Sequence, residues 1–269
     1  MTGKTAVRAV SLLLLCLTML AGCGKAVDEQ ASQTLSEAVS EAASEDRFCA
    51  DFLMEATFSD PGSGQSGVLY FIDGRASCDR KEQKAFQEFR VTLLGASSHA
   101  CEYLTPTKKI HVEDDEQFTE EIDASVQEPG DGFLAAFPYS RLTIPTLAQT
   151  ESLTAPEAGN GLYVLTAREG QKELIEKVWK LDLYTLAGIT VPDREKESFG
   201  DVVYECLIKN GALSSVTVRL NAVLYQKAGY TPGYTPKDDE NRLELSLRVK
   251  LSFVSFGREV QIPEYQENS

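Results

Sequence analysis

The sequence predicts an α+β protein in which antiparallel β-strands predominate, because apolar and polar residues alternate over long stretches that turn residues separate. In residues 243–253, apolar side chains occupy the odd-numbered positions, and polar or charged side chains occupy the even ones. A similar alternation runs from Phe48 to Phe58. Between two later strand-like runs lies Asn210-Gly211, a dipeptide that readily adopts the positive φ angles of a type I′ hairpin turn. These three observations favour half-buried strands joined by short turns.

A few helices and loops complete the predicted secondary structure. Residues 171–188 have apolar side chains along one side and end at Gly188, a candidate helix C-cap, although their C-terminal half also alternates like a strand. Residues 115–160 are rich in proline, glycine and acids, and predict loops with a short helix near residues 117–125. The tandem repeat GYTPGYTP at residues 229–236 predicts a connecting loop, either a mobile tip or a contact surface, because proline and glycine disfavour ladder pairing.

The N-terminal residues have the pattern of an export signal. Lys4 and Arg8 precede an apolar run over residues 9–21, which is shorter than the roughly 20 residues of a transmembrane helix. The run leads into Leu-Ala-Gly-Cys at residues 20–23, which resembles the lipobox of bacterial lipoproteins. The resemblance implies removal of residues 1–22 as a signal peptide and lipidation of the Cys23 thiol. The alternative is an ordinary signal peptide with a coincidental cysteine.

Lipidation implies a location outside the cytoplasm, at the cell surface or in the periplasm. Two acyl chains anchor a protein stably, since each buried methylene contributes about 0.8 kcal/mol. Residues 23–46 are rich in alanine, serine and glutamate and predict a lipid-anchored tether, in which Leu35 and Val39 allow a short helix. Residues 47–269 are then predicted to form a single β-rich domain. The membrane, reached through the N-terminal lipid, is the predicted partner.

The charge balance argues against nucleic acids as partners and leaves protein partners open. The chain has 41 Asp and Glu residues against 26 Lys and Arg residues, for a net charge of −15. Such a surface repels nucleic acids and anionic lipid headgroups, so no nucleic-acid binding is expected. Hydrophobic residues make up 42% of the chain, which is enough for a core and argues against disorder.

The sequence lacks recognisable catalytic and cofactor motifs, so we expect that the protein is not an enzyme. The glycines Gly62, Gly64 and Gly67 match the spacing of a dinucleotide site, but a strand-like run follows them where a helix is needed, so a hairpin loop is expected. His99 and His111 lie in different strand-like runs, and no G-x-S-x-G elbow accompanies them. Metal-ligand spacings are also lacking, and no acidic pair stands out for glycoside hydrolysis. No catalytic residue, metal or cofactor is predicted.

Four cysteines remain beside Cys23 in the exported chain: Cys49, Cys78, Cys101 and Cys206. An even number in an exported domain is compatible with two disulfides, and four cysteines allow three connectivities. A hairpin around residues 62–65 places Cys49 nearly opposite Cys78, which would leave Cys101 with Cys206. The alternative is that some or all are buried free thiols.

Taken together, these features resemble the bacterial lipoproteins of the LolA/LppX type over residues 48–265. The resemblance rests on the lipobox, the tether, two sets of strands, a helix at residues 172–181 before the hairpin at residues 199–220, and a final strand at residues 260–265. It implies a strongly curved antiparallel sheet, a half-barrel, that wraps a few helices and encloses an apolar cavity. This chain departs from the family in its four additional cysteines and its acidic middle segment.

The resemblance implies a lipoprotein that binds a lipid or another hydrophobic ligand in the cavity of its sheet. No ligand-binding residue can be carried over, because the family holds its ligand by shape and apolar lining. The alternative is a structural or protein-interaction lipoprotein with a filled core and no small-molecule ligand.

Overall fold

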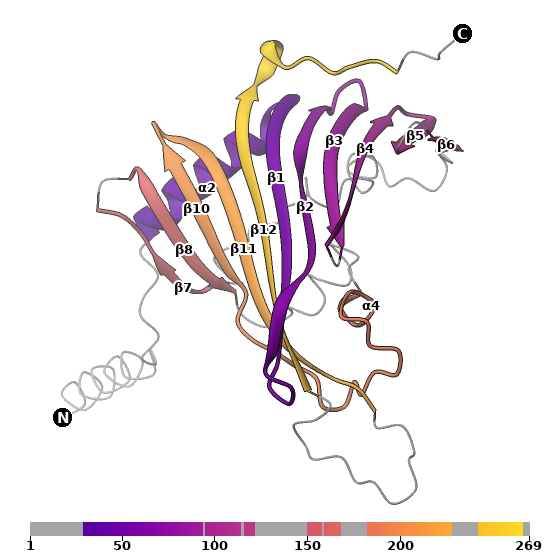
Figure 1. Cartoon of the computed structure of the whole chain (residues 1–269). Helices are drawn as coiled ribbons and strands as arrows, with labels where there is room; N and C mark the ends of the chain where they lie inside the picture. Colours follow the sequence, from indigo (N-terminus) through magenta and orange to yellow (C-terminus); the bar gives the residue numbers. More distant parts are fainter. Residues whose placement is uncertain are drawn as a thin grey trace, which may run out of the picture.

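The computed structural model describes residues 29–93, 95–113, 116–121, 150–157, 159–167, 182–227 and 242–265. Its main feature is one antiparallel sheet with the strand order β6-β5-β4-β3-β2-β1-β12-β11-β10-β8-β7, while β9 pairs with β11 (Figure 1). The strands are β1 (Arg47–Asp60), β2 (Gln65–Asp79), β3 (Lys84–Leu93), β4 (Ala96–Leu104), β5 (Lys108–Glu113), β6 (Glu116–Glu121), β7 (Thr150–Thr154), β8 (Gly161–Ala167), β9 (Ser198–Phe199), β10 (Val203–Lys209), β11 (Ala212–Tyr225) and β12 (Arg242–Phe256).

The sheet is open, because β6 and β7 form separate edges at its two ends. The last strand, β12, pairs with the first strand, β1, near the middle of the sheet. Strand direction turns progressively from β7 to β4 in Figure 1, as the right-handed twist of strands requires. The predicted predominance of antiparallel strands is therefore confirmed.

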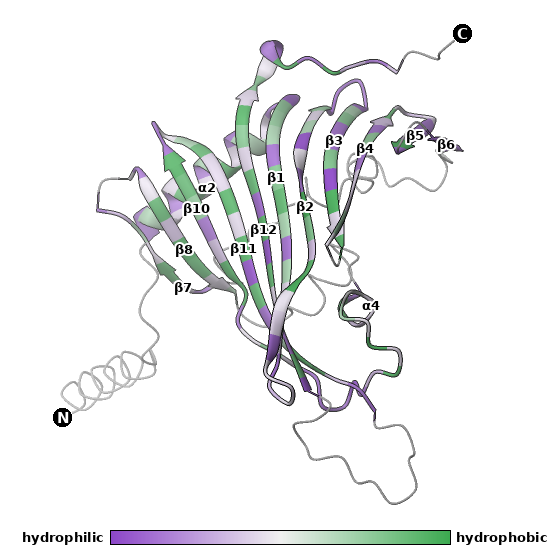
Figure 2. Ribbon diagram, viewed as in Figure 1, coloured by the Kyte–Doolittle hydropathy of each residue, from purple (hydrophilic) through white to green (hydrophobic). Residues whose placement is uncertain are grey.

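Register assigns alternate residues of each strand to one of two faces, because directly opposite residues in antiparallel strands project to the same side. Phe52 of β1 lies opposite Leu251 of β12, and Leu251 lies opposite Val216 of β11. All three side chains are buried, and we call their side of the sheet the apolar face. The other side carries Asp51 and Lys250, and we call it the charged face. Figure 2 shows the resulting bands of alternating hydropathy along the strands.

The long strands agree with the alternation in the sequence. In β12, the odd-numbered residues from Leu245 to Leu251 are buried, and the even-numbered residues between them are exposed or half-buried. In β1, Phe48, Met54 and the other even-numbered residues up to 56 are buried in the same way. The predicted faces of residues 243–253 and 48–58 are thus confirmed.

Both predicted hairpins are present. Asn210 and Gly211 have φ angles of 53° and 80° and connect β10 to β11, as a type I′ turn requires. The glycine-rich residues 62–67 join β1 to β2, and the Asp60 carboxylate accepts hydrogen bonds from the backbone N–H of Gly62 and the hydroxyl of Ser63. This stretch is a turn between strands, so it lacks the helix that would present backbone N–H groups to a phosphate.

The segment predicted as a tether is in part a helix that packs on the sheet. Helix α2 (Glu29–Ser44) contacts β10 and β11, and it buries Ala31, Leu35 and Ala38 (Figure 1). The short helix that Leu35 and Val39 allowed is therefore present, but it packs on the sheet, so residues 29–44 are not a free spacer. Two alanines beside one leucine let the helix backbone approach the sheet closely, so a thin apolar stripe is sufficient for docking.

The structure bears on three further predictions: the helices expected near residues 117–125 and 171–188, and the helix end at Gly188. The helix expected near residues 117–125 is wrong for the residues that are described there, because they form the exposed edge strand β6. Most of the helix expected over residues 171–188 lies outside the described residues, but helix α4 (Leu183–Leu186) follows the N-cap Asp182, whose carboxylate accepts hydrogen bonds from backbone N–H groups. Gly188 has a φ of 69° and donates its N–H to the Thr185 carbonyl, which confirms it as a helix-ending residue.

The C-terminal segment is extended but does not form the predicted final strand. A short 3₁₀ helix, η5 (Gly257–Glu259), follows β12, and residues 260–265 continue without ladder pairing. The Tyr265 ring packs edge-on against Tyr103 of β4, at 5.3 Å between centroids. Across the part of the chain that the structure describes, no helix has the length and apolar character needed to cross a membrane.

Candidate functional site

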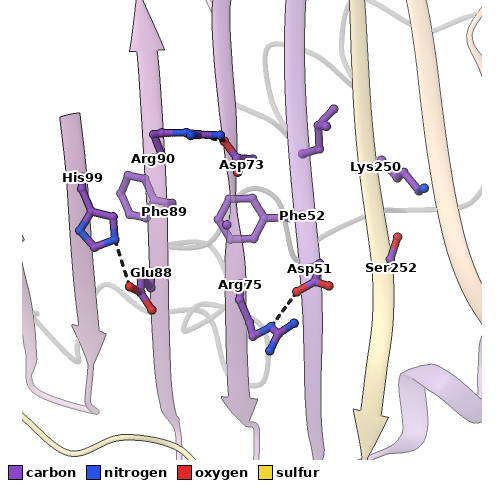
Figure 3. Close-up of a pocket in the computed structure, with 12 residues that line it drawn as sticks. Asp51, Phe52, Asp73, Arg75, Glu88, Phe89, Arg90, His99, Lys250 and Ser252 are labelled. Carbon is purple, nitrogen blue, oxygen red and sulfur yellow. Dashed lines mark hydrogen bonds and ion pairs between the residues drawn. The ribbon is translucent and has the colours of Figure 1, made fainter. Parts of the chain in front are cut away.

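A groove on the charged face crosses β12, β1, β2, β3 and β4 (Figure 3). It has a volume of about 710 Å³. Its walls carry three acidic side chains, three basic side chains and one histidine, so it is close to neutral in an otherwise acidic protein: Asp51, Asp73, Glu88, Arg75, Arg90, Lys250 and His99.

The groove includes Gly74 of β2, whose Cα hydrogen takes the place of a side chain on the opposite, apolar face of the sheet. A Cβ at this position would lie 2.8 Å from the Phe52 ring and closer still to the backbone carbonyl oxygen of Glu88. Phe52 and Phe89 lie opposite Gly74 on the neighbouring strands, and their ring centroids are 6.4 Å apart on the apolar face. The missing side chain therefore leaves space that the Phe52 ring fills, an arrangement known to stabilise glycine within sheets.

Two arginine–carboxylate pairs bridge neighbouring strands along the groove. The Arg75 Nε lies 2.7 Å from the Asp51 carboxylate, and an Arg90 Nη lies 2.9 Å from the Asp73 carboxylate (Figure 3). The hydrogen bond from Arg75 to Asp51 raises the pKa of the Arg75 guanidinium above its usual value. Both pairs are about half exposed, so each is worth at most about 1 kcal/mol, and they define the shape and charge of the groove more than its stability.

The two histidines, His99 and His111, lie on opposite faces of the sheet. The His99 Nε2 on β4 lies 3.0 Å from the Glu88 carboxylate on the charged face. His111 on β5 lies on the apolar face, where its Nδ1 is 3.0 Å from the Glu102 carboxylate. Both histidines are therefore hydrogen-bonded, and their separation across the sheet excludes a site that uses the two imidazoles together.

A polar cluster interrupts the apolar face at β3, β4 and β5. The buried Glu102 carboxylate accepts a hydrogen bond from the Gln87 amide and lies 2.9 Å from the Lys109 ammonium, in addition to its contact with His111. A carboxylate with three partners is a satisfied buried charge, because its oxygens can accept about four hydrogen bonds. We interpret this cluster as structural.

The expected disulfide between Cys49 and Cys78 is wrong. Cys49 lies opposite Ser77, while Cys78 lies opposite Phe48, so this offset of one residue sends the two thiols to opposite faces of the sheet. All four described cysteines are free thiols. Cys101 and Cys206 are also separated, because β4 and β10 are six strand spacings apart, roughly 29 Å along the sheet, whereas a disulfide needs Cα atoms within about 7 Å.

Cys101 projects from the charged face beside His99 and Glu88. It lies directly opposite Glu88 in the register of β3 and β4, and it lies two residues after His99 on the same strand. Partial burial and the nearby Glu88 carboxylate raise the pKa of the Cys101 thiol. A raised pKa disfavours the thiolate that nucleophilic catalysis requires, so this triplet is poorly suited to an activated cysteine nucleophile.

Two sequence features that were predicted to matter lie outside the described residues. These are the lipidation site, Cys23, and the loop at residues 229–236. Sequence patterns also missed the groove, because its residues come from five strands and converge only through cross-strand register. Its main local signal is Gly74 within an otherwise regular strand, which is typical of a close approach by another group.

Comparisons with known proteins add one structural similarity. No family model and no curated protein matches the chain. The solved structure of LprF from Mycobacterium bovis aligns with a TM-score of 0.41 and 9% sequence identity, covering 88% of this chain and 98% of that one. A similarity at this level is too low to carry an argument about fold or function.

Proposed function

We propose that this protein is a membrane-anchored, extracytoplasmic lipoprotein that binds a lipid or another hydrophobic ligand against the apolar face of a curved, half-barrel sheet. The anchor rests on the lipobox pattern that ends at Cys23. The proposal assigns residues 1–22 to a signal peptide and gives the protein no catalytic role. Its relation to the LolA/LppX type rests on this lipobox and on architecture.

The observation that carries the ligand proposal is the extent of the apolar face. Buried apolar residues continue without a break from Tyr204 on β10, through Val218, Val249 and Met54, to Ile72 on β2. Among the described helices, α2 packs on β10 and β11 at one end of this surface, and α4 adds Leu183 and Tyr184 to the same buried core. These side chains are already covered within the protein, so a ligand that binds along β12, β1 and β2 must displace part of that cover. An apolar ligand can replace the lost contacts, because each Å² of apolar area that it covers contributes about 25 cal/mol.

A second candidate function is supported by the groove on the charged face. Three cations and three carboxylates arranged across five strands form a patterned polar surface, which is typical of the rim of a protein interface. In this reading the apolar face is a filled core, and the protein is a structural or interaction lipoprotein without a small-molecule ligand.

Native mass spectrometry of the purified protein separates the two functions. The Cys23→Ser variant is the protein of choice, because it lacks the lipid anchor whose own acyl chains could occupy the apolar face. The ligand proposal expects an acyl-sized mass that is present under native conditions and lost under denaturing conditions, together with saturable binding of a fluorescent fatty acid. A native mass equal to that of the protein alone, together with no binding of the fluorescent fatty acid, would overturn the ligand proposal and favour an interaction lipoprotein.

A further inference from the structure

The charged face brings together three side chains whose chemistry suits a metal ion. Glu88, His99 and Cys101 each offer one ligand atom, and these atoms lie within 4.8 Å of one another. The Glu88 oxygen and the His99 Nε2 are already 3.0 Å apart. In a tetrahedral zinc site, with bonds of about 2.0–2.3 Å, neighbouring ligand atoms are roughly 3.5 Å apart. Small rotations of exposed side chains would bring the Cys101 sulfur into this range.

The strands hold the three residues in a fixed relation. Glu88 and Cys101 are direct partners in the ladder between β3 and β4, and His99 lies two residues from Cys101 on the same face. Direct cross-strand partners have Cβ atoms about 4.5–5.5 Å apart, and this spacing is set by backbone hydrogen bonds. The site is therefore arranged by strand pairing, in the interior of the sheet and away from both edge strands.

Two arginines stand near the cluster, and each is already neutralised. Arg90 is the direct partner of His99, and Arg75 is the direct partner of Glu88. Arg90 pairs with Asp73 and Arg75 pairs with Asp51, so neither guanidinium needs the Glu88 carboxylate as its counterion. The carboxylate and the imidazole contact each other and remain accessible, with side-chain exposures of 55% and 58%.

The donor set decides the class of cation. Thiolate and imidazole are ligands for borderline-soft transition metals, whereas Mg²⁺ and Ca²⁺ take oxygen ligands. One thiolate, one imidazole and one carboxylate make a three-ligand set that leaves a fourth tetrahedral position open. We propose that Glu88, His99 and Cys101 form a binding site for Zn²⁺ or a similar divalent transition-metal ion, with its open position facing the groove. Binding releases the Cys101 thiol proton to solvent as the metal–sulfur bond forms.

Cobalt substitution tests the site directly, because a thiolate bound to Co²⁺ absorbs in the near ultraviolet. The full chain, purified in detergent and stripped with a chelator, is titrated with Co²⁺ and then with Zn²⁺ as a competitor. We expect one Co²⁺ per chain, a thiolate charge-transfer band, displacement by Zn²⁺ and no displacement by excess Mg²⁺. Absence of saturable Co²⁺ or Zn²⁺ binding would overturn the proposal.

Variants identify the ligands. Cys101→Ser should abolish the thiolate band, and His99→Ala or Glu88→Gln should weaken Zn²⁺ binding by at least about tenfold. Cys49→Ser is the matched control and should change nothing, because Cys49 is another half-buried thiol that belongs to no cluster of three metal-ligating groups among the described residues. His99 and Glu88 are exposed, so their variants are expected to fold, as circular dichroism can verify. If Zn²⁺ binds equally to the wild type and to the Cys101, His99 and Glu88 variants, the assignment of these three ligands is contradicted.

Discussion

Truncation of Leu247 to alanine tests the placement of the central strand β12 in the core. Leu247 is 1% exposed, and it lies between Ala56 on β1 and Leu220 on β11, which are also buried. The truncation removes three carbon atoms, worth about 0.8 kcal/mol each in transfer free energy, and it leaves a cavity that the small Ala56 cannot fill. We expect a loss of roughly 3–4 kcal/mol in the free energy of unfolding. For a domain of this size, the midpoint of thermal unfolding should fall by roughly 6–16 °C.

Ser246 provides the control on the adjacent position. Its side chain projects from the other face, between Thr57 and Asn221, and it is exposed. Ser246→Ala should change the free energy of unfolding by less than about 0.5 kcal/mol. Urea denaturation of the two variants and the wild type measures both values. Similar losses for both variants, or a loss below about 1 kcal/mol for Leu247→Ala, would refute the assignment of faces.

The same variant bears on the ligand proposal. If Leu247 contacts a bound hydrophobic molecule, its truncation should reduce the affinity for a fluorescent fatty acid and cost less stability than a packed core demands. A full core penalty, combined with no probe binding by the wild type, would favour the interaction lipoprotein instead.

Three further predictions concern the anchor, Gly74 and the buried thiols. Cys23→Ser should release the protein from membranes or leave an uncleaved precursor, as membrane fractionation can show. If the variant stays in the membrane fraction and is cleaved normally, the lipobox prediction is contradicted. Gly74→Ala should destabilise the protein by about 1–3 kcal/mol in urea denaturation, because the new Cβ would meet the Glu88 carbonyl oxygen and the side chains of Phe89 and Phe52. Gly67→Ala on the same strand meets only the movable Phe58 ring and should cost less. The reverse order would contradict the close packing around Gly74. Burial raises the pKa of the Cys78 and Cys206 thiols from 9.0 to about 12. Both thiols should therefore resist iodoacetamide near pH 8 until urea is added, and rapid labelling of the native protein would count against their burial. Their contribution to stability should be lost as the pH rises from about 9 toward 12, because the thiols ionise first in the unfolded chain.

The positions of the strands could be read from local patterns, because burial of one face of a sheet imposes a period of two on the residues. This is why the buried faces of β1 and β12 agree with the prediction, and why Asn210-Gly211 marks its turn. Where the local pattern was weak, the prediction was wrong. Residues 116–121 are exposed at an edge, so β6 has no apolar alternation to reveal it.

The pairing of cysteines shows what a sequence pattern leaves open. A hairpin between residues 49 and 78 could be foreseen, but the parity of the register could not, and a shift of one residue sends a side chain to the other face. The register of β3 and β4 likewise brings Cys101 beside Glu88 and on the same face as His99. Because the three residues come from two strands, no spacing along the chain marks them as a group.

The sequence by itself determined the acidic charge, the antiparallel class and the two hairpin turns, because each depends on neighbouring residues or on total composition. Lipidation at Cys23 stays a prediction from the lipobox pattern. The tertiary structure alone decided that α2 packs on β10 and β11, that the thiols remain separate, and that the groove crosses five strands. These features depend on which strand lies beside which and in what register. Such pairing is settled by the packing of the whole sheet, since many local patterns are compatible with more than one partner.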